Sequence, residues 1–298
     1  MSESHAEARP FFTLTQNALA DGTYLDYLQA MYGQRIYIAT KDDSQQCFQQ
    51  YTNDAVLRLQ EGKLEPGEDV KIENSGVQVK GQVAVMAVNA LIAKVIFDRN
   101  PDREFYIEES FPLDWMYPHL TPNGLILKIN RQPWPALPEE IVRQDHQYWS
   151  DYLAPMLGDW LKDETSVSQL AAMVEKLYLQ HDLAGFSGDP QFIQDTWAQK
   201  AFSKLRSSIG GVYRWRADHA KTDEERQRMT GAADFAFRQA LALCPYSPEA
   251  IFRYVDLLVS EHRLEDARQV AETGLKFDRG NNQIASLIEN LKTLKPKQ

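Results

Sequence analysis

The sequence has very little cysteine and no excess of basic residues, and each shortage excludes a class of protein. The two cysteines, Cys47 and Cys244, fall in different parts of the chain, so they predict no disulfide framework. Lys and Arg total 32 against 42 Asp and Glu, which gives a net charge of -10. Since a dedicated nucleic-acid-binding protein needs a basic footprint, no nucleic-acid partner is expected.

Long apolar runs are also missing. The most apolar segment, residues 83–96, is interrupted by Asn89 and Lys94 and falls short of the roughly 20 apolar residues that a spanning helix needs. The first ten residues hold no apolar signal core. These features predict a soluble chain, cytoplasmic as written, with no direct membrane insertion.

The common motifs of catalysis are absent as well. Neither glycine-rich phosphate loop occurs, there is no H-E-x-x-H, and the six histidines are scattered without ligand spacing. Gly185-Phe-Ser-Gly188 is superficially like a nucleophile elbow, but that elbow needs a preceding strand and here a helical pattern precedes it. The sequence therefore predicts no catalytic residue, no metal ligand and no cofactor.

In the first half of the chain, strand patterns alternate with helical patterns. The strand patterns are at 11–15, 35–40, 105–107 and 125–129, with a small hairpin at 70–79. The helical patterns are at 21–32, 42–59 and 81–98. Such alternation indicates parallel crossovers, so residues 9–132 are predicted to form a small three-layer, Rossmann-like α/β domain.

A proline-rich segment, 131–138, follows and predicts a stiff boundary. Beyond it only helical patterns occur, so residues 139–298 are predicted to form an all-α domain. Within that domain Ala233, Phe237, Ala240 and Pro245 align with Ala267, Ala271, Gly274 and Arg279, each pair 34 residues apart.

That spacing is the period of the tetratricopeptide repeat. Ile209, Gly210 and Tyr213 add its Leu-Gly-x-x-Tyr arrangement in an opening helix. Residues 203–291 are therefore predicted to be a tetratricopeptide-like array, with an ordinary helical hairpin as the alternative. Because two repeats are fewer than the three or so needed for stability, the helices of 139–199 are expected to cap the array.

Two candidate binding sites follow from these domains. Ligands of open α/β sheets bind at the carboxyl ends of the strands, and six polar residues are predicted there: Asn17, Asp21, Asp42, Asp43, Glu108 and Glu109. Such a rim suits a sugar or a cation; alternatively, its aspartates only cap helices.

The second candidate is a peptide groove on the opening helices of the repeats. The repeat register places five residues on its concave face: Lys204, Arg214, Trp215, Phe252 and Asp256. Cations and rings suit an extended acidic peptide. The alternative is that the basic stretch around Arg206, Arg214 and Arg216 is a solvated helix face.

Several stretches resemble one family. They are Thr15-Gln-Asn-Ala-Leu-Ala-Asp-Gly-Thr-Tyr-Leu25, Phe48-Gln-Gln-Tyr51, Phe97-Asp-Arg-Asn-Pro-Asp-Arg103 with Phe105-Tyr-Ile-Glu-Glu109, and Phe202-Ser-Lys-Leu-Arg-Ser-Ser-Ile-Gly-Gly-Val-Tyr213. About residues 9–280 resemble the soluble C-terminal region of bacterial multi-spanning membrane proteins grouped with protein O-mannosyltransferases. The resemblance implies an extracytoplasmic tail that ends in tetratricopeptide repeats, while the catalytic acids lie between membrane helices and have no counterpart here.

Together these features favour a non-catalytic accessory domain that positions an acceptor or partner protein for a membrane glycosyltransferase core. Two alternatives stay open. One is a self-contained sugar- or nucleotide-binding α/β enzyme with a helical lid. The other is a free cytoplasmic tetratricopeptide adaptor.

Overall fold

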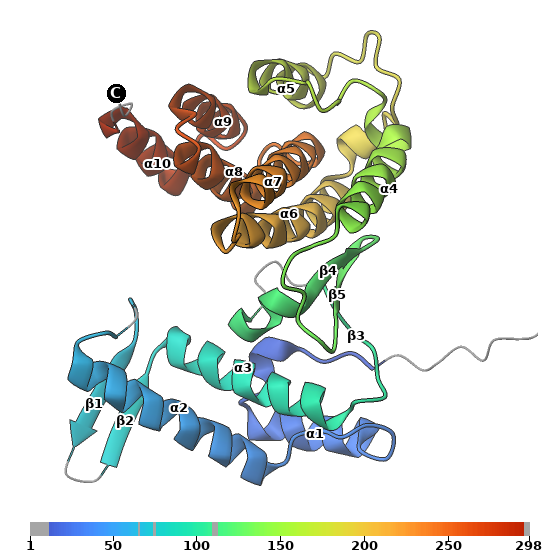
Figure 1. Ribbon diagram of the computed structural model, residues 1–298. Coiled ribbons are helices and arrows are strands. Elements are labelled where there is room, and N and C mark those ends of the chain that lie inside the picture. Colours follow the sequence, from blue (N-terminus) through green and yellow to red (C-terminus); the bar gives the residue numbers. More distant parts are fainter. Residues whose placement is uncertain (1–11, 65, 74–75, 109–112, 295–298) are drawn as a thin grey trace, which may run out of the picture. The chain divides into compact units, whose positions relative to one another are not determined.

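The structure, a computed structural model, describes residues 12–64, 66–73, 76–108 and 113–294. The chain divides into two units: residues 1–103 with 113–115, and residues 104–112 with 116–298. Helices make up most of both units (Figure 1). No helix in the described ranges is long and apolar enough to cross a membrane.

In the described residues, the first unit contains three α-helices and a hairpin. Its elements are η1 (Gln16–Ala18), α1 (Gly22–Tyr32), α2 (Lys41–Glu61), β1 (Asp69–Glu73), β2 (Gly76–Lys80) and α3 (Gln82–Arg99). The hairpin strands pair antiparallel, as the sequence predicts. The N-cap of α2 is Thr40, and Asp43 completes a capping box with it.

The prediction of a parallel sheet in this part of the chain is wrong. Residues 12–15 and 35–40 form no strand, and Phe11 lies outside the described residues. Asn100, the C-cap of α3, bonds the second of these segments instead. Asn100 accepts from the Tyr37 amide at 2.8 Å and donates to the Tyr37 carbonyl at 2.9 Å. Because one side chain supplies both partners that a neighbouring strand would supply, the segment needs no sheet.

The second unit begins with a three-stranded sheet. Its strands are β3 (Phe105–Ile107), β4 (Leu120–Asn123) and β5 (Ile126–Ile129), preceded at β4 by the 3₁₀-helix η2 (Asp114–His119). The order is β3-β5-β4, and both pairings are antiparallel. Every strand pairing of the described residues is thus antiparallel, so the three-layer Rossmann-like arrangement is not found. The sequence missed β4, which contains Pro122.

The proline-rich segment is fixed to the helices that follow it. Arg216 donates to the carbonyl of Trp134 at 2.5 Å, Arg228 donates to the carbonyl of Leu137 at 2.6 Å, and the Leu137 side chain is buried. The second unit therefore includes both the sheet and this segment, and its boundary precedes β3. Independent folding of residues 9–132 and 139–298 stays a prediction.

Helices form the rest of the second unit. They are α4 (Glu139–Leu157), α5 (Val167–Val174) with a π-helical turn η3 (Glu175–Leu179), η4 (Phe192–Gln194), α6 (Thr196–Asp218), α7 (Asp223–Leu243), α8 (Pro248–Ser260), α9 (Leu264–Phe277) and α10 (Asn282–Thr293). Side-chain caps fix where several begin: Asp195 caps α6, Thr222 caps α7 and Ser247 caps α8.

The last five helices pack as successive hairpins, α6 with α7 and α8 with α9, followed by α10 (Figure 1). The small residues of the 34-residue alignment lie at the close crossings. Ala240 and Ala267 have 0% exposure. A Cβ on Gly210 would lie 2.8 Å from the Phe237 ring, and one on Gly274 would clash with Ile251. The repeats therefore depend on these positions staying small.

Enlarging an alanine at a crossing is expected to destabilise the second unit. Ala267→Leu or Ala240→Leu forces three extra heavy atoms into a filled interface, which costs about 1–3 kcal/mol of unfolding free energy. Urea unfolding measures the change, and Ala201→Leu on the exposed face of α6 is the matched control. Equal stability of the crossing variants and the control would contradict this packing.

Candidate functional site

The five residues predicted to line a peptide groove come from α6 and α8. An ion pair joins two of them across these helices: the Arg214 Nε lies 3.7 Å from an Asp256 carboxylate oxygen. Arg214 also pairs with Asp218 at 2.9 Å, one turn along α6. Since the Arg214 side chain is 21% exposed and that of Asp256 is 74% exposed, the pair lies at the surface. The contact brings Arg214 and Asp256 together, and a peptide groove lined by the five residues stays a prediction.

Trp215, the aromatic residue of α6 predicted to line the groove, packs within its own unit. The Trp215 ring stacks on Tyr117 at 5.3 Å and on His219 at 4.1 Å between ring centroids. This stacking leaves the indole half-buried. Lys204 is half-buried as well. The predicted basic and aromatic residues of α6 are therefore partly committed to the fold.

Phe252 lies beside a hollow that the sequence analysis did not anticipate. The hollow measures about 560 Å³, and the rest of its lining comes from α10: Asn282, Gln283, Ser286, Leu287 and Asn290. Adding the 34-residue period to Phe252 and Asp256 gives Ser286 and Asn290. The signal was therefore present in the sequence, since α10 continues the register as the opening helix of a third repeat.

Arg253 ties α8 to α6 beneath this face. It donates to the Ser207 carbonyl at 2.9 Å and pairs with Glu249 at 3.5 Å. A Cβ on Gly211 would lie 2.6 Å from the Arg253 guanidinium, so glycine at that position leaves room for the cation. Burial lowers the pKa of Arg253 despite the nearby Glu249 carboxylate. This arginine therefore holds the two helices in register.

The six polar residues predicted to form an acidic rim do not share a sheet edge, because the described residues form no parallel sheet that would align them. Asp21 accepts from the Thr23 amide at the start of α1, and Asp42 is exposed in the first turn of α2. The carbonyl of Asn17 accepts from Asn89. Exposed Glu108 belongs to the second unit, and Glu109 lies outside the described residues. Ligand binding by this set stays a prediction.

Asp43 is the most constrained member of that set. It accepts from the Tyr37 hydroxyl at 2.5 Å and from the Thr40 amide at 2.8 Å. Burial acts to raise the pKa of Asp43, but the hydrogen bonds from Tyr37 and Thr40 outweigh it and lower the pKa. The carboxylate therefore stays ionised while it caps α2.

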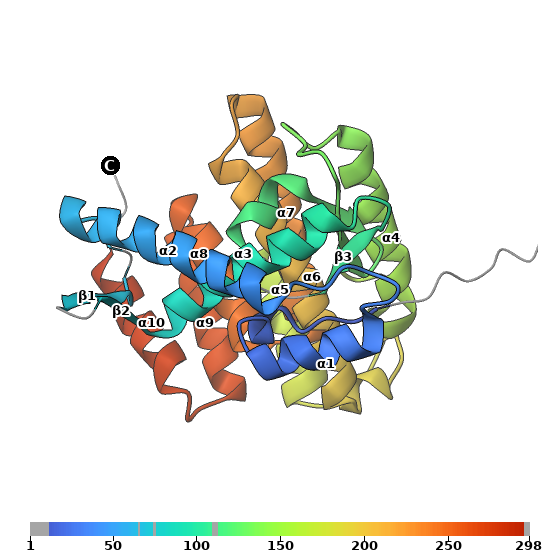
Figure 2. The ribbon, with the colours of Figure 1, turned by 90° about the horizontal axis from the view of Figure 1, so that it is seen from below.

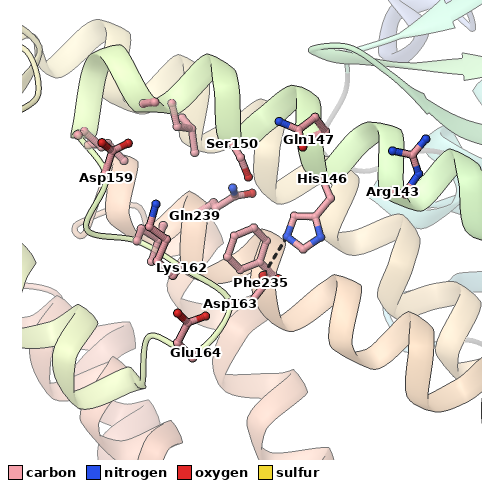
Figure 3. Close-up of a pocket in the computed structure, with 15 residues that line it drawn as sticks. Arg143, His146, Gln147, Ser150, Asp159, Lys162, Asp163, Glu164, Phe235 and Gln239 are labelled. Atoms are coloured by element: carbon pink, nitrogen blue, oxygen red, sulfur yellow. Dashed lines mark ion pairs between the residues drawn. The ribbon is translucent and has the colours of Figure 1, made fainter.

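A second hollow, of about 380 Å³, lies between α4, the segment 158–164 and α7. Figure 3 shows His146, Asp163, Phe235 and Gln239 directed toward it. His146 Nε2 lies 3.0 Å from an Asp163 oxygen, and its ring packs on Phe235 at 4.1 Å. Arg238 fixes the same segment by donating to the carbonyls of Asp163 and Thr165.

Gln239, which lines this hollow, also contacts a buried charge pair formed by Arg206 and Asp145. Arg206 donates to Asp145 at 2.8 Å and to Gln239 at 2.7 Å, and Tyr213 donates to the same Asp145 oxygen at 2.8 Å. The guanidinium also lies over the Trp149 ring. Arg206 and Arg216, expected on a solvated face, are in fact buried. No group of three His, Cys, Asp or Glu residues within the described ranges is placed to hold a metal ion.

His146 predicts a pH dependence of stability. Burial lowers its pKa, and the Asp163 charge only partly opposes this. The unfolded state therefore binds a proton first as the pH falls below about 6.5, and folding stability is lost by at most about 1.4 kcal/mol per pH unit. Urea unfolding at pH 7.5 and 5.5 measures the loss, which His146→Gln is expected to reduce. If the pH dependence of stability is unchanged in that variant, it does not come from His146.

Comparison with known families supports the helical-repeat part. The tetratricopeptide repeat family model matches residues 226–291, which run from within α7 to α10. Comparisons with curated proteins and with solved structures give no match. The prediction of a tetratricopeptide-like C-terminal part is therefore confirmed. Repeats of this kind stack into extended surfaces that bind proteins or peptides.

Proposed function

We propose that this chain is a protein-interaction module that holds an extended segment of a partner protein across α6, α8 and α10. The observation that supports it most is the shared register: Arg214 and Asp256 meet across two opening helices, and Phe252 continues into the hollow with Ser286 and Asn290 of the third. The proposed face therefore combines a cation, an aromatic ring and amides.

The chemistry of that face suits a segment with an acidic and an apolar side chain. Ion pairs between exposed residues contribute only about 0–1 kcal/mol. An incoming carboxylate can therefore replace Asp218 or Asp256 at Arg214 with little loss, while Lys204 adds positive charge. Phe252 offers an apolar contact in the hollow, and the amides of Gln283 and Asn290 can bond the partner's main chain.

Site-specific photo-crosslinking tests this proposal. A photoreactive amino acid at Phe252 or at Ser286 is expected to capture the same partner segment in cells of the source organism, identified by mass spectrometry. The control position is Trp197, which is 84% exposed at the start of α6 and lies outside the register. Capture of unrelated proteins, or equal capture at all three positions, would contradict a binding role for this face.

The partner itself is the finer part of the proposal. The family resemblance of the sequence supports a membrane glycosyltransferase core, to which this chain would present an acceptor. Crosslinks from Phe252 to a multi-spanning glycosyltransferase or to its acceptor protein would support that assignment. Crosslinks only to other cytoplasmic proteins would favour a free tetratricopeptide adaptor instead.

A further inference from the structure

The first unit carries a groove that the proposed function does not use. It lies between α2 and α3, two helices that run beside each other (Figures 1 and 2), and measures about 1200 Å³. Its two walls differ in chemistry. The α2 wall carries side-chain amides, and the α3 wall carries small apolar side chains.

The amides form a regular row along α2: Gln46, Gln49, Gln50 and Asn53. This i, i+3, i+4, i+7 spacing places them on one face of the helix. All four are exposed, and none hydrogen-bonds to another residue within the described ranges. Each amide offers two N–H donors and a carbonyl acceptor, which are the groups that pair with a peptide main chain.

The spacing of the amides along α2 is close to the spacing of peptide groups along one edge of an extended chain. Amides on adjacent turns of α2 are about 5.4 Å apart along the axis. Peptide groups on one edge of an extended strand recur about every 6.7 Å. Flexible glutamine side chains span that difference, so the row of about two turns can bond successive peptide groups of one strand edge.

The α3 wall of the groove accounts for apolar residues of α3 that the core of the unit does not need. That helix is apolar on nearly all sides, whereas one buried stripe is enough to cover the core of the unit: Ala84, Val88, Ile92 and Ile96. A second stripe, Val83, Ala87, Ala90 and Leu91, lines the groove instead and is only partly buried. The two alanines leave room between the larger side chains for apolar groups of an occupant.

The charges of the groove disfavour an anionic occupant. Arg58 pairs with Glu68, whose side chain is 1% exposed, at 2.6 Å, and it also pairs with Asp54. Tyr51 donates to Glu68 at 2.7 Å. With Asp114 included, the lining carries three carboxylates and one guanidinium. Nucleic acids and acidic peptides therefore meet repulsion here, unlike at the face of α6, α8 and α10.

We propose that this groove binds an extended, uncharged segment of a partner protein, whose main chain hydrogen-bonds the amides of α2 and whose alternate apolar side chains contact α3. The site is separate from the peptide face of the helical repeats, and it selects a segment of different charge. Recognition through the main chain makes it tolerant of sequence wherever side chains alternate between apolar and small polar.

Peptide phage display on the full chain tests this. Random twelve-residue peptides are selected on the wild type and counter-selected on a Gln49→Ala, Gln50→Ala, Asn53→Ala variant, which keeps the repeat face intact. The selected peptides are then synthesised, and fluorescence anisotropy gives their affinities. Gln45→Ala with Gln60→Ala, two exposed amides of α2 outside the groove, is the matched control. Alanine favours helix, and thermal melts confirm that both variants fold.

The expected peptides are uncharged and alternate in polarity. Their affinity should fall about tenfold or more in the groove variant, since several hydrogen bonds are lost, and stay unchanged in the control. Methylation of alternate backbone nitrogens should weaken binding similarly. The proposal is overturned if no selected peptide distinguishes wild type from the groove variant, if the peptides are acidic, or if backbone methylation has no effect.

Discussion

Asp145→Asn is expected to lower the free energy of unfolding by about 3–5 kcal/mol, the cost of leaving a buried charge without its partner. The Asp145 and Arg206 side chains are 2% and 1% exposed, and they meet at 2.8 Å. Asparagine keeps the volume of the side chain but removes the counter-charge of the guanidinium. Tyr213 loses an ionised acceptor in the same step. Equilibrium urea unfolding, followed by tryptophan fluorescence, measures the loss.

The control is the same Asp→Asn substitution in an Asp–Arg pair at the surface. Asp223 pairs with Arg226 at 2.9 Å, with side chains 81% and 51% exposed, so Asp223→Asn is expected to cost about 0–1 kcal/mol. Replacing both buried partners, as in Asp145→Leu with Arg206→Met, should restore most of the stability because no unpaired charge remains. Similar losses for Asp145→Asn and Asp223→Asn would show that the buried pair is not strongly coupled.

Arg216→Met is expected to cost about 2–4 kcal/mol, because it removes the hydrogen bonds that a buried guanidinium donates to several backbone carbonyls. Arg216 is 4% exposed. It donates to Trp134 at 2.5 Å, to Pro118 at 2.9 Å and to Leu120 at 3.3 Å. Methionine retains much of the packing of the apolar stem, so the loss reports the hydrogen bonds. Urea unfolding measures it.

Hydrogen exchange gives this prediction a local readout. The Trp134 amide donates to the Pro118 carbonyl at 2.9 Å, next to the Arg216 contacts, so its exchange should accelerate in Arg216→Met. The control Arg226→Met removes a guanidinium that is 51% exposed and should leave both stability and exchange unchanged. Full protection of the Trp134 amide in Arg216→Met would mean that the arginine does not hold the proline-rich segment.

Part of the proposed peptide face follows from the sequence. The repeat register, taken from Gly210 in α6 and Ala267 in α9, predicted that Arg214, Phe252 and Asp256 share a face, because the register of a repeat is carried by local periodicity. The contribution of α10 was missed, although the same period reaches Ser286 and Asn290. The stacking of Trp215 on Tyr117 and His219 was beyond prediction, since those contacts depend on how distant segments pack.

The sequence by itself determined where the helices lie and where they repeat, since helical periodicity, caps and small residues at crossings are local signals. It determined the hairpin at 70–79 for the same reason. The strand pattern at 35–40 marked a segment that contains a buried residue, Ile38, but it did not give the hydrogen-bonding partner of that segment.

Only the tertiary structure decided that partner. A backbone segment with one buried face is satisfied equally by a neighbouring strand or by a side-chain amide, and here Asn100 bonds Tyr37 while Asn89 bonds Asn17 and Ala20. The partners of buried charged residues were also decided only by the tertiary structure. Arg206 and Arg216 look like a solvated face in the sequence, yet tertiary packing supplies a carboxylate to one and carbonyls to the other, and such partners make burial of a charge possible.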